Sequence, residues 1–115
     1  SPMQLYNDPA NLFVAGFIGS PKMNFVAGRL VGRDAHTIGV RPEHITLEAG
    51  AGELAGTVTH VEQLGADTNV YLDCGEAGLI VARMFGQYEI AVGSRRFARF
   101  QAGRAFAFDQ AGQRI

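Results

Sequence analysis

The sequence contains little cysteine, little lysine and no long apolar run. Cys74 is the single cysteine among the 115 residues, so no intrachain disulfide can form, which fits a reducing compartment. Of the 10 basic residues, only Lys22 is a lysine. The apolar stretch 12–18 is shorter than the roughly 18 residues of a membrane span, and no basic segment precedes it. It is therefore neither a membrane helix nor a signal peptide.

The sequence also lacks the short motifs that mark common catalytic sites. It has no Gly-x-x-x-x-Gly-Lys-Ser/Thr loop for ATP phosphates and no Gly-x-Ser-x-Gly turn for a serine nucleophile. His36, His44 and His60 are scattered, and no His-x-x-x-His or Cys-x-x-Cys pair indicates a metal site. Cys74 falls at an inward strand position and is predicted to be a core residue. We expect no catalytic residue, cofactor or metal in this chain.

The charge gives no reason to expect nucleic acid as a partner. The formal net charge is −1 at pH 7. One stretch does interleave arginines with phenylalanines: Arg95, Arg96, Phe97, Arg99, Phe100, Arg104 and Phe106. It could be a surface for single strands, or a barrel wall with phenylalanines inside and arginines in solvent. The slightly negative total charge favours the barrel wall.

Most of the chain has the period-two pattern of β-strands. The segments predicted as strands are 24–31, 37–40, 56–64, 68–74, 79–84, 89–92, 97–101 and 104–109. Strands 56–64 and 68–74 should form a hairpin whose inward side chains are Val58, Val61, Leu64, Val70, Leu72 and Cys74. With 15 glycines for turns and no alternation of strands with helices, the pattern predicts a mainly β protein. We expect a small, closed or half-closed barrel.

One short helix is predicted before the barrel. Asp8 can cap its amino end and Pro9 suits its first position, while Gly19 would end it. Phe13, Val14, Phe17 and Ile18 would give this helix a wide apolar side. A helix of about ten residues is marginal alone and needs a surface to pack against. We therefore divide the chain into a linker and connecting helix, 1–19, and a β-barrel, 20–115.

Two polar clusters are candidates for a functional site. Arg41, Glu43 and His44 surround Pro42, and they could form an anion site, an acid/base pair or a rigid turn at a strand end. Glu62 and Asp67 flank the predicted hairpin turn, where they could act as a carboxylate pair or simply be solvated. Because no second catalytic group lies nearby in the sequence, we favour the rigid turn and the solvated hairpin.

Several long motifs carry a resemblance to a known family. They are 1–6 with 9–11, 13–25 (FVAGFIGSPKMNF), 39–44 (GVRPEH), 61–68 (VEQLGADT), and 108–109 with 112–115. In this order they resemble the carboxyl-terminal regulatory (TOBE) domain of ATP-binding subunits of bacterial carbohydrate ABC importers, of the maltose and glycerol-3-phosphate type. The start at Ser1-Pro2 without an initiating methionine is expected either for an excised piece of a larger protein or for a chain from which a tag was cleaved.

The resemblance implies a small β-barrel similar to the oligonucleotide-binding fold. This regulatory module follows an ATPase domain and pairs with a second copy of itself. Expected subunit-contact or regulatory residues are Arg41, Glu43, His44, Glu62, Gln63 and Asp67. Phe13, Val14, Phe17 and Ile18 are expected to contact the ATPase domain. ATP and Mg²⁺ belong to the parent protein, which would act at the inner face of the cell membrane with membrane subunits, and a signalling protein is a further expected partner.

Two features qualify this expectation. The stretch 26–38 is shorter than in the family, which predicts an incomplete or differently closed first part of the barrel. Related modules bind oxyanions, so a small-ligand sensor that uses Arg41 and His44 is the alternative function.

Overall fold

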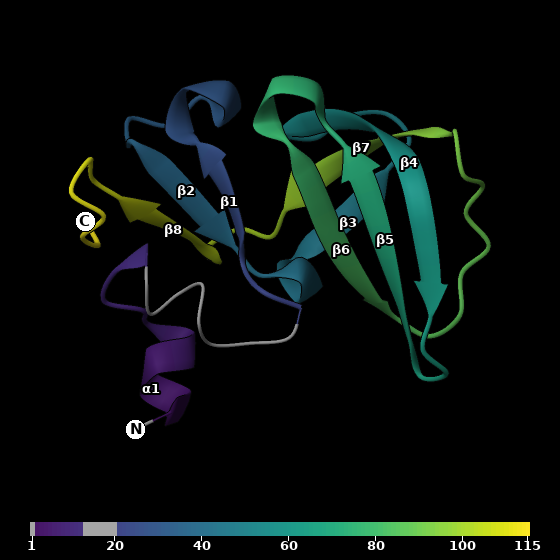
Figure 1. The fold of residues 1–115 in the computed structure, drawn as a ribbon, viewed down its shortest axis with the longest axis horizontal. Helices are drawn as coiled ribbons and strands as arrows, with labels where there is room; N and C mark the ends of the chain where they lie inside the picture. The colour runs from purple at the N-terminus through teal and green to yellow at the C-terminus, as the bar shows by residue number, and fades with distance from the viewer. Residues whose placement is uncertain (1, 13–20) are drawn as a thin grey trace.

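The computed structural model describes residues 2–12 and 21–115, which form two antiparallel sheets (Figure 1). The smaller sheet has the order β1-β2-β8: β1 (Asn24–Ala27), β2 (Thr37–Val40) and β8 (Ala105–Phe108). The larger sheet has the order β3-β7-β4-β5-β6: β3 (Ile45–Glu48), β7 (Arg95–Phe100), β4 (Leu54–Gln63), β5 (Asp67–Asp73) and β6 (Leu79–Phe85). The mainly β fold is therefore confirmed.

The helices within the described ranges are short. They are α1 (Pro2–Asn7) and the 3-10 helices η1 (Gly28–Val31), η2 (Pro42–His44) and η3 (Gly75–Ala77). No helix in residues 2–12 and 21–115 has the length and apolar character needed to traverse a bilayer.

The predicted barrel does not close. The larger sheet curls until its two edge strands, β3 and β6, come into contact, but no ladder of hydrogen bonds joins them. β3 has only four residues, because η2 precedes it and a glycine-containing loop follows it. β3 is hydrogen-bonded along one edge to β7, and its other edge forms no ladder with β6. The smaller sheet lies beside β6 as a separate sheet (Figure 1).

The predicted strands differ from the observed ones mainly at their ends. The hairpin of β4 and β5 is confirmed, with Val58, Val70 and Leu72 fully buried. Leu64 is exposed instead of inward, because β4 ends at Gln63 and Leu64 already belongs to the turn. Residues 89–92 form no strand, and β3 was not predicted. The first predicted strand, 24–31, gives way to η1 at Gly28.

The predicted amino-terminal helix is wrong where the structure can be compared with it. Asp8 does not begin a helix: its amide donates to the Gln4 carbonyl (2.8 Å) and ends α1. The following residues are held instead by the carboxyl-terminal turn. Leu12 donates its amide to the Gly112 carbonyl (3.0 Å), and Arg114 forms an ion pair with Asp8. The remainder of that predicted helix, 13–19, lies outside the described residues.

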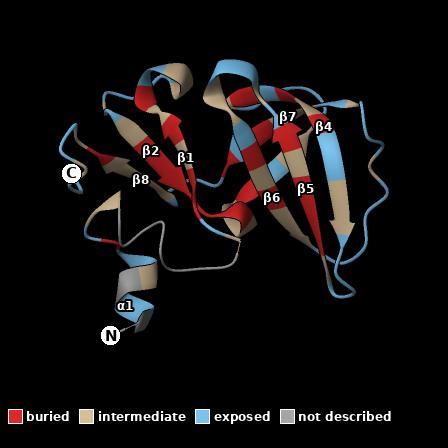
Figure 2. Cartoon of the chain, in the orientation of Figure 1, coloured by how far each residue is buried: buried red, intermediate tan, exposed pale blue. Residues whose placement is uncertain are grey.

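One apolar core joins the two sheets. Its buried members are Val26, Ile38, Val40, Ile45, Leu54, Ile80, Ala82, Ala98 and Phe100, which come from both sheets. The smaller sheet is also covered on its other face, where Phe108 and Met23 pack with Leu12, Phe25 and Phe106. Buried positions consequently run along strands of both sheets, while outer loops are exposed (Figure 2). The alternation of alanine and phenylalanine in β8 reflects these two faces.

Asn24 fastens the smaller sheet to the free edge of β6. Its Nδ2 donates to the carbonyls of Val81 (2.9 Å) and Val40 (3.2 Å), and its Oδ1 accepts from the Val81 amide (2.8 Å). The side chain therefore satisfies both main-chain groups of an edge residue, as a neighbouring strand would.

Candidate interaction site

The polar residues predicted from the sequence lie on two sides of the edge strand β6. Arg41, Glu43 and His44 occupy the connection from β2 to β3, and η2 within it packs against β6. Glu62 lies near the end of β4, and Asp67 begins β5, the strand that pairs with β6. The fold therefore brings the two motifs close to the same edge, although β3 and most of β4 separate them in sequence.

Arg41 is turned into its own chain. It is 1% exposed, its guanidinium carbon lies 4.2 Å from the centre of the Tyr6 ring, and its Nη2 donates to the Tyr6 carbonyl (3.2 Å). Burial lowers the pKa of Arg41. The guanidinium thus holds α1 against the sheet junction by a cation–π contact and a hydrogen bond. This placement disfavours Arg41 as a ligand for a free oxyanion.

His44 and Glu43 are both partly exposed, but they face different surroundings. The Nδ1 atom of His44 is buried and has no hydrogen-bond partner within the described ranges. Burial lowers the pKa of His44, nearby Glu43 raises it, and Arg104 and Arg41 lower it further. Glu43 is half-exposed and lines a groove that also contains Arg83 of β6. Of the three predicted residues in this motif, Glu43 is therefore the one that lines the groove.

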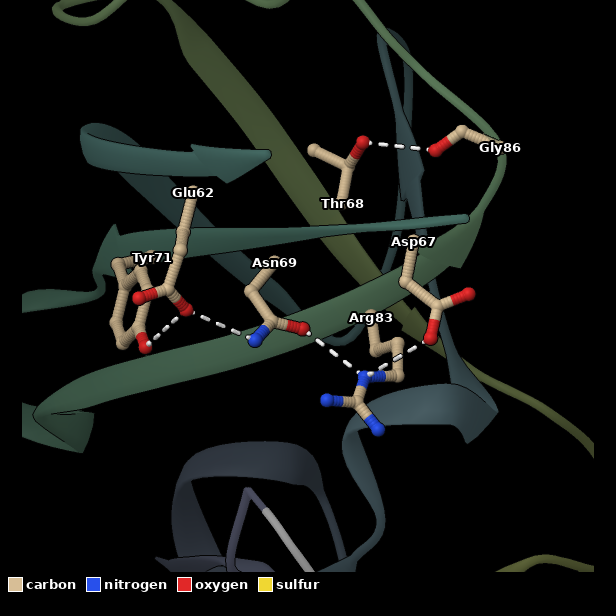
Figure 3. Close-up of polar contacts among 7 residues, drawn as sticks. All are labelled: Glu62, Asp67, Thr68, Asn69, Tyr71, Arg83 and Gly86. Atoms are coloured by element: carbon tan, nitrogen blue, oxygen red, sulfur yellow. Dashed lines mark hydrogen bonds and ion pairs between the residues drawn. The ribbon is translucent and has the colours of Figure 1, made fainter. Parts of the chain in front are cut away.

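A chain of polar contacts crosses the outer face of β4, β5 and β6 (Figure 3). Glu62 Oε1 accepts hydrogen bonds from Asn69 Nδ2 (3.1 Å) and the Tyr71 hydroxyl (3.4 Å). Asn69 Oδ1 accepts from Arg83 Nε (3.1 Å), which lies 3.8 Å from Asp67 Oδ2. Two of the predicted residues, Glu62 and Asp67, are thereby linked through side chains that were not predicted.

The strand register explains why these side chains meet. Glu62, Asn69 and Arg83 are directly opposite one another across three antiparallel strands, so they project from the same face. Burial raises the pKa of Tyr71, and neighbouring Glu62 raises it further. Asn69 could have been found by aligning the predicted hairpin and reading every second residue on its polar side, whereas Arg83 belongs to the next strand, β6.

The end of the hairpin is held firmly beside the segment that follows β6. Gln63 donates through Nε2 to the Tyr88 carbonyl (2.8 Å), and the Gly86 amide donates to the Ala66 carbonyl (2.6 Å). Thr68 also donates to the Gly86 carbonyl (2.8 Å; Figure 3). Gln63, the third predicted residue of this motif, therefore fixes the position of the loop that carries Tyr88.

The remaining predictions concern catalysis, metals and the ATPase domain. Residues 2–12 and 21–115 contain no group of three His, Cys, Asp or Glu side chains placed to hold a metal ion. Cys74 is partly buried against the core, and burial raises the pKa of its thiol. Phe13, Val14, Phe17 and Ile18 lie outside the described residues.

Comparison with known proteins identifies similar chains. A family model described as the TOBE domain matches residues 38–108. The lactose transport ATP-binding protein LacK of Rhizobium radiobacter is 38% identical, across 100% of this chain and 40% of its own length. The sn-glycerol-3-phosphate import ATP-binding protein UgpC of Chromohalobacter salexigens is 35% identical, across 100% and 38%. The chain thus spans about two fifths of these relatives.

Proposed function

Because this chain belongs to the TOBE-domain family, as its motifs predicted, we propose that it is the non-catalytic regulatory domain of a carbohydrate ABC importer. The observation that carries the proposal is similarity over the whole chain to ATP-binding proteins named for lactose and glycerol-3-phosphate transport. The remaining three fifths of such a parent would contain the ATPase domain, with its ATP and Mg²⁺. This chain would then support ATP-driven import without touching the nucleotide.

Within that role, the domain would hold two ATP-binding subunits together. Glu62, Gln63 and Asp67 support this proposal, because internal hydrogen bonds and an ion pair fix them at one end of the larger sheet. Groups that are already ordered lose less entropy when a partner binds. Glu43 lines the adjacent groove and would belong to the same contact, while Arg41 and His44 would support it from the sheet junction.

The proposal also places the domain among other partners. In this proposal, residues 1–19 connect the ATPase domain to the regulatory domain, 20–115. The apolar residues of the connecting stretch would contact the ATPase domain: Phe13, Val14, Phe17 and Ile18. Through the parent, the domain would be peripheral to the inner face of the membrane and associated with the importer's membrane subunits. A signalling protein would be a further partner.

Multi-angle light scattering on the purified chain tests the dimer. We expect a concentration-dependent mass approaching twice the 12.3 kDa of one chain. A constant monomer mass at about 1 mM, a concentration at which even weak association is populated, would remove the dimerisation role.

An ATPase assay tests the non-catalytic role separately. We expect no turnover above buffer, because the chain lacks the glycine-rich loop that binds ATP phosphates. Turnover that persists after a second purification would contradict this part of the proposal.

A further inference from the structure

Three large apolar side chains are exposed together at the end of β6 and the adjoining turn. Phe85 is 73% exposed, Leu64 49% and Tyr88 45%. The hydrogen bonds that tie Gly86 to Ala66 and Tyr88 to Gln63 keep these side chains in one region. Single exposed apolar residues are common, but a cluster of large ones beside a groove is typical of a protein interface.

The adjacent groove runs between the two edge strands of the larger sheet. Its lining is formed by Glu43, Ile45, Thr46, Leu47, Arg83, Met84, Phe85 and Tyr88. It therefore combines an apolar wall with one acidic and one basic side chain. The same surface carries a projecting aromatic side chain, Phe85, and a recess of matching apolar character.

Arg83 is oriented to meet a carboxylate from outside. Its Nε atom is engaged by Asn69 Oδ1 at 3.1 Å, which fixes the guanidinium. The two terminal nitrogens have no hydrogen-bond partner in the part of the chain that the structure describes, and in Figure 3 the dashed lines from Arg83 leave Nε alone. A guanidinium held in this way can bind a carboxylate through both terminal nitrogens.

We propose that a second copy of this chain occupies the groove. Across a two-fold axis, Phe85 of each copy would enter the other copy's groove, and Arg83 of each copy would pair with Glu43 of the other. Two-fold contacts require one patch to complement itself, and this patch contains a projection with a recess and a cation with an anion. The inference rests on the proposed dimerisation and assigns its surface.

The apolar part is tested with a pair of matched variants. Phe85→Ser should weaken self-association about tenfold or more in a dilution series followed by sedimentation velocity. Leu79→Ser is the control, because Leu79 is 59% exposed on the same face at the opposite end of β6. Its dissociation constant should match that of the unaltered chain.

The charged part is tested by exchanging the two charges. Glu43→Arg and Arg83→Glu should each weaken the homodimer, because each places like charges opposite one another twice. An equimolar mixture should restore association, since both contacts in the mixed dimer then join opposite charges. Circular dichroism establishes that each variant is folded. If Arg83→Glu unfolds, the double variant carrying both changes should dimerise like the unaltered chain.

The outcomes separate this inference from the proposed function. A dimer that is insensitive to Phe85→Ser, or equally weakened by Leu79→Ser, overturns the assigned surface and leaves the dimerisation role standing. Mixed charge variants that stay monomeric overturn the pairing of Arg83 with Glu43. A chain that is monomeric at about 1 mM overturns both proposals.

Discussion

Asn24 is the residue on which the contact between the sheets depends most directly. Replacement by alanine leaves the amide and carbonyl of Val81 without their partner, which should cost about 1–3 kcal/mol of unfolding free energy. Asn24→Asp should cost more at pH 7, because it places a carboxylate oxygen against the carbonyls of Val81 and Val40. Urea unfolding measures both effects.

The same experiment at lower pH provides a check on that reason. Once the new carboxyl group is protonated it regains a donor, so Asn24→Asp should approach the stability of Asn24→Ala or exceed it near pH 4, relative to the unaltered chain at that pH. Asn7→Asp, at the exposed end of α1, is the control. An equal penalty for Asn24→Asp at both pH values would show that the amide donor is unimportant.

His44 should make stability depend on pH. Burial places its folded-state pKa below the ordinary value near 6.5, so the unfolded chain binds the proton more tightly. The unfolding free energy should therefore fall as the pH drops below about 6.5. His44→Gln should flatten this dependence in urea titrations from pH 8 to pH 5, whereas His60→Gln, at an exposed position of β4, should retain it.

Among individual residues, the sequence supplied candidates for a site but not their spatial arrangement. Glu43, Glu62, Gln63 and Asp67 could be selected because polar residues surround a proline and a turn. Which side chains lie opposite one another depends on the register of β4, β5 and β6, and this register is set only when the three strands pair. Arg83 was therefore missed, although it connects the two motifs.

At the level of single elements, η1 depends on a close approach between main-chain atoms. A Cβ atom on Gly28 would lie 2.0 Å from the Ala35 carbonyl oxygen, and the Gly28 amide donates to the His36 carbonyl. Gly28→Ala should therefore destabilise the chain by about 1–3 kcal/mol, as overpacking does in cores. Gly50→Ala is the matched control, since a Cβ there would meet nothing within 4 Å. Thermal unfolding compares them, and similar midpoints would contradict this account.

The elements were predictable where local pattern and tertiary contact agree. The hairpin of β4 and β5 has alternating side chains and a short turn, so it could be found from sequence. β3 could not, because it is four residues long and follows a proline motif that reads as a turn. The expected helix does not begin at Pro9, because contacts with Gly112 and Arg114 hold residues 8–11 in another conformation.

For the whole molecule, the shared core predicts a single unfolding transition. Ile38 of the smaller sheet is 1% exposed and packs with side chains from the larger sheet. Ile38→Ala should lower the free energy of unfolding by about 2–5 kcal/mol. In a urea titration followed by amide signals, the unfolding midpoint should fall equally for residues of both sheets. Val92→Ala, at a side chain that is 64% exposed, should change neither. Separate midpoints for the two sheets would show that they are independent units.

The overall architecture was predicted as a class but not as a shape. Glycine-rich turns and many short strands indicate a small β protein, and the shortened stretch 26–38 suggested an altered first half. Whether β3 and β6 form a ladder depends on the lengths of these two edge strands, and β3 was not predicted at all. One missed edge strand of four residues therefore decides whether the sheet is expected to close.

The path of the chain has a consequence for the order in which the protein is built. All strands of the larger sheet lie within residues 45–100. The smaller sheet is complete only when β2 has paired with β8, which begins at Ala105. During synthesis, the larger sheet and the β3–β6 groove can assemble while the smaller sheet still lacks its last strand. The ion pair between Asp8 and Arg114 forms later still, because Arg114 must first leave the ribosome.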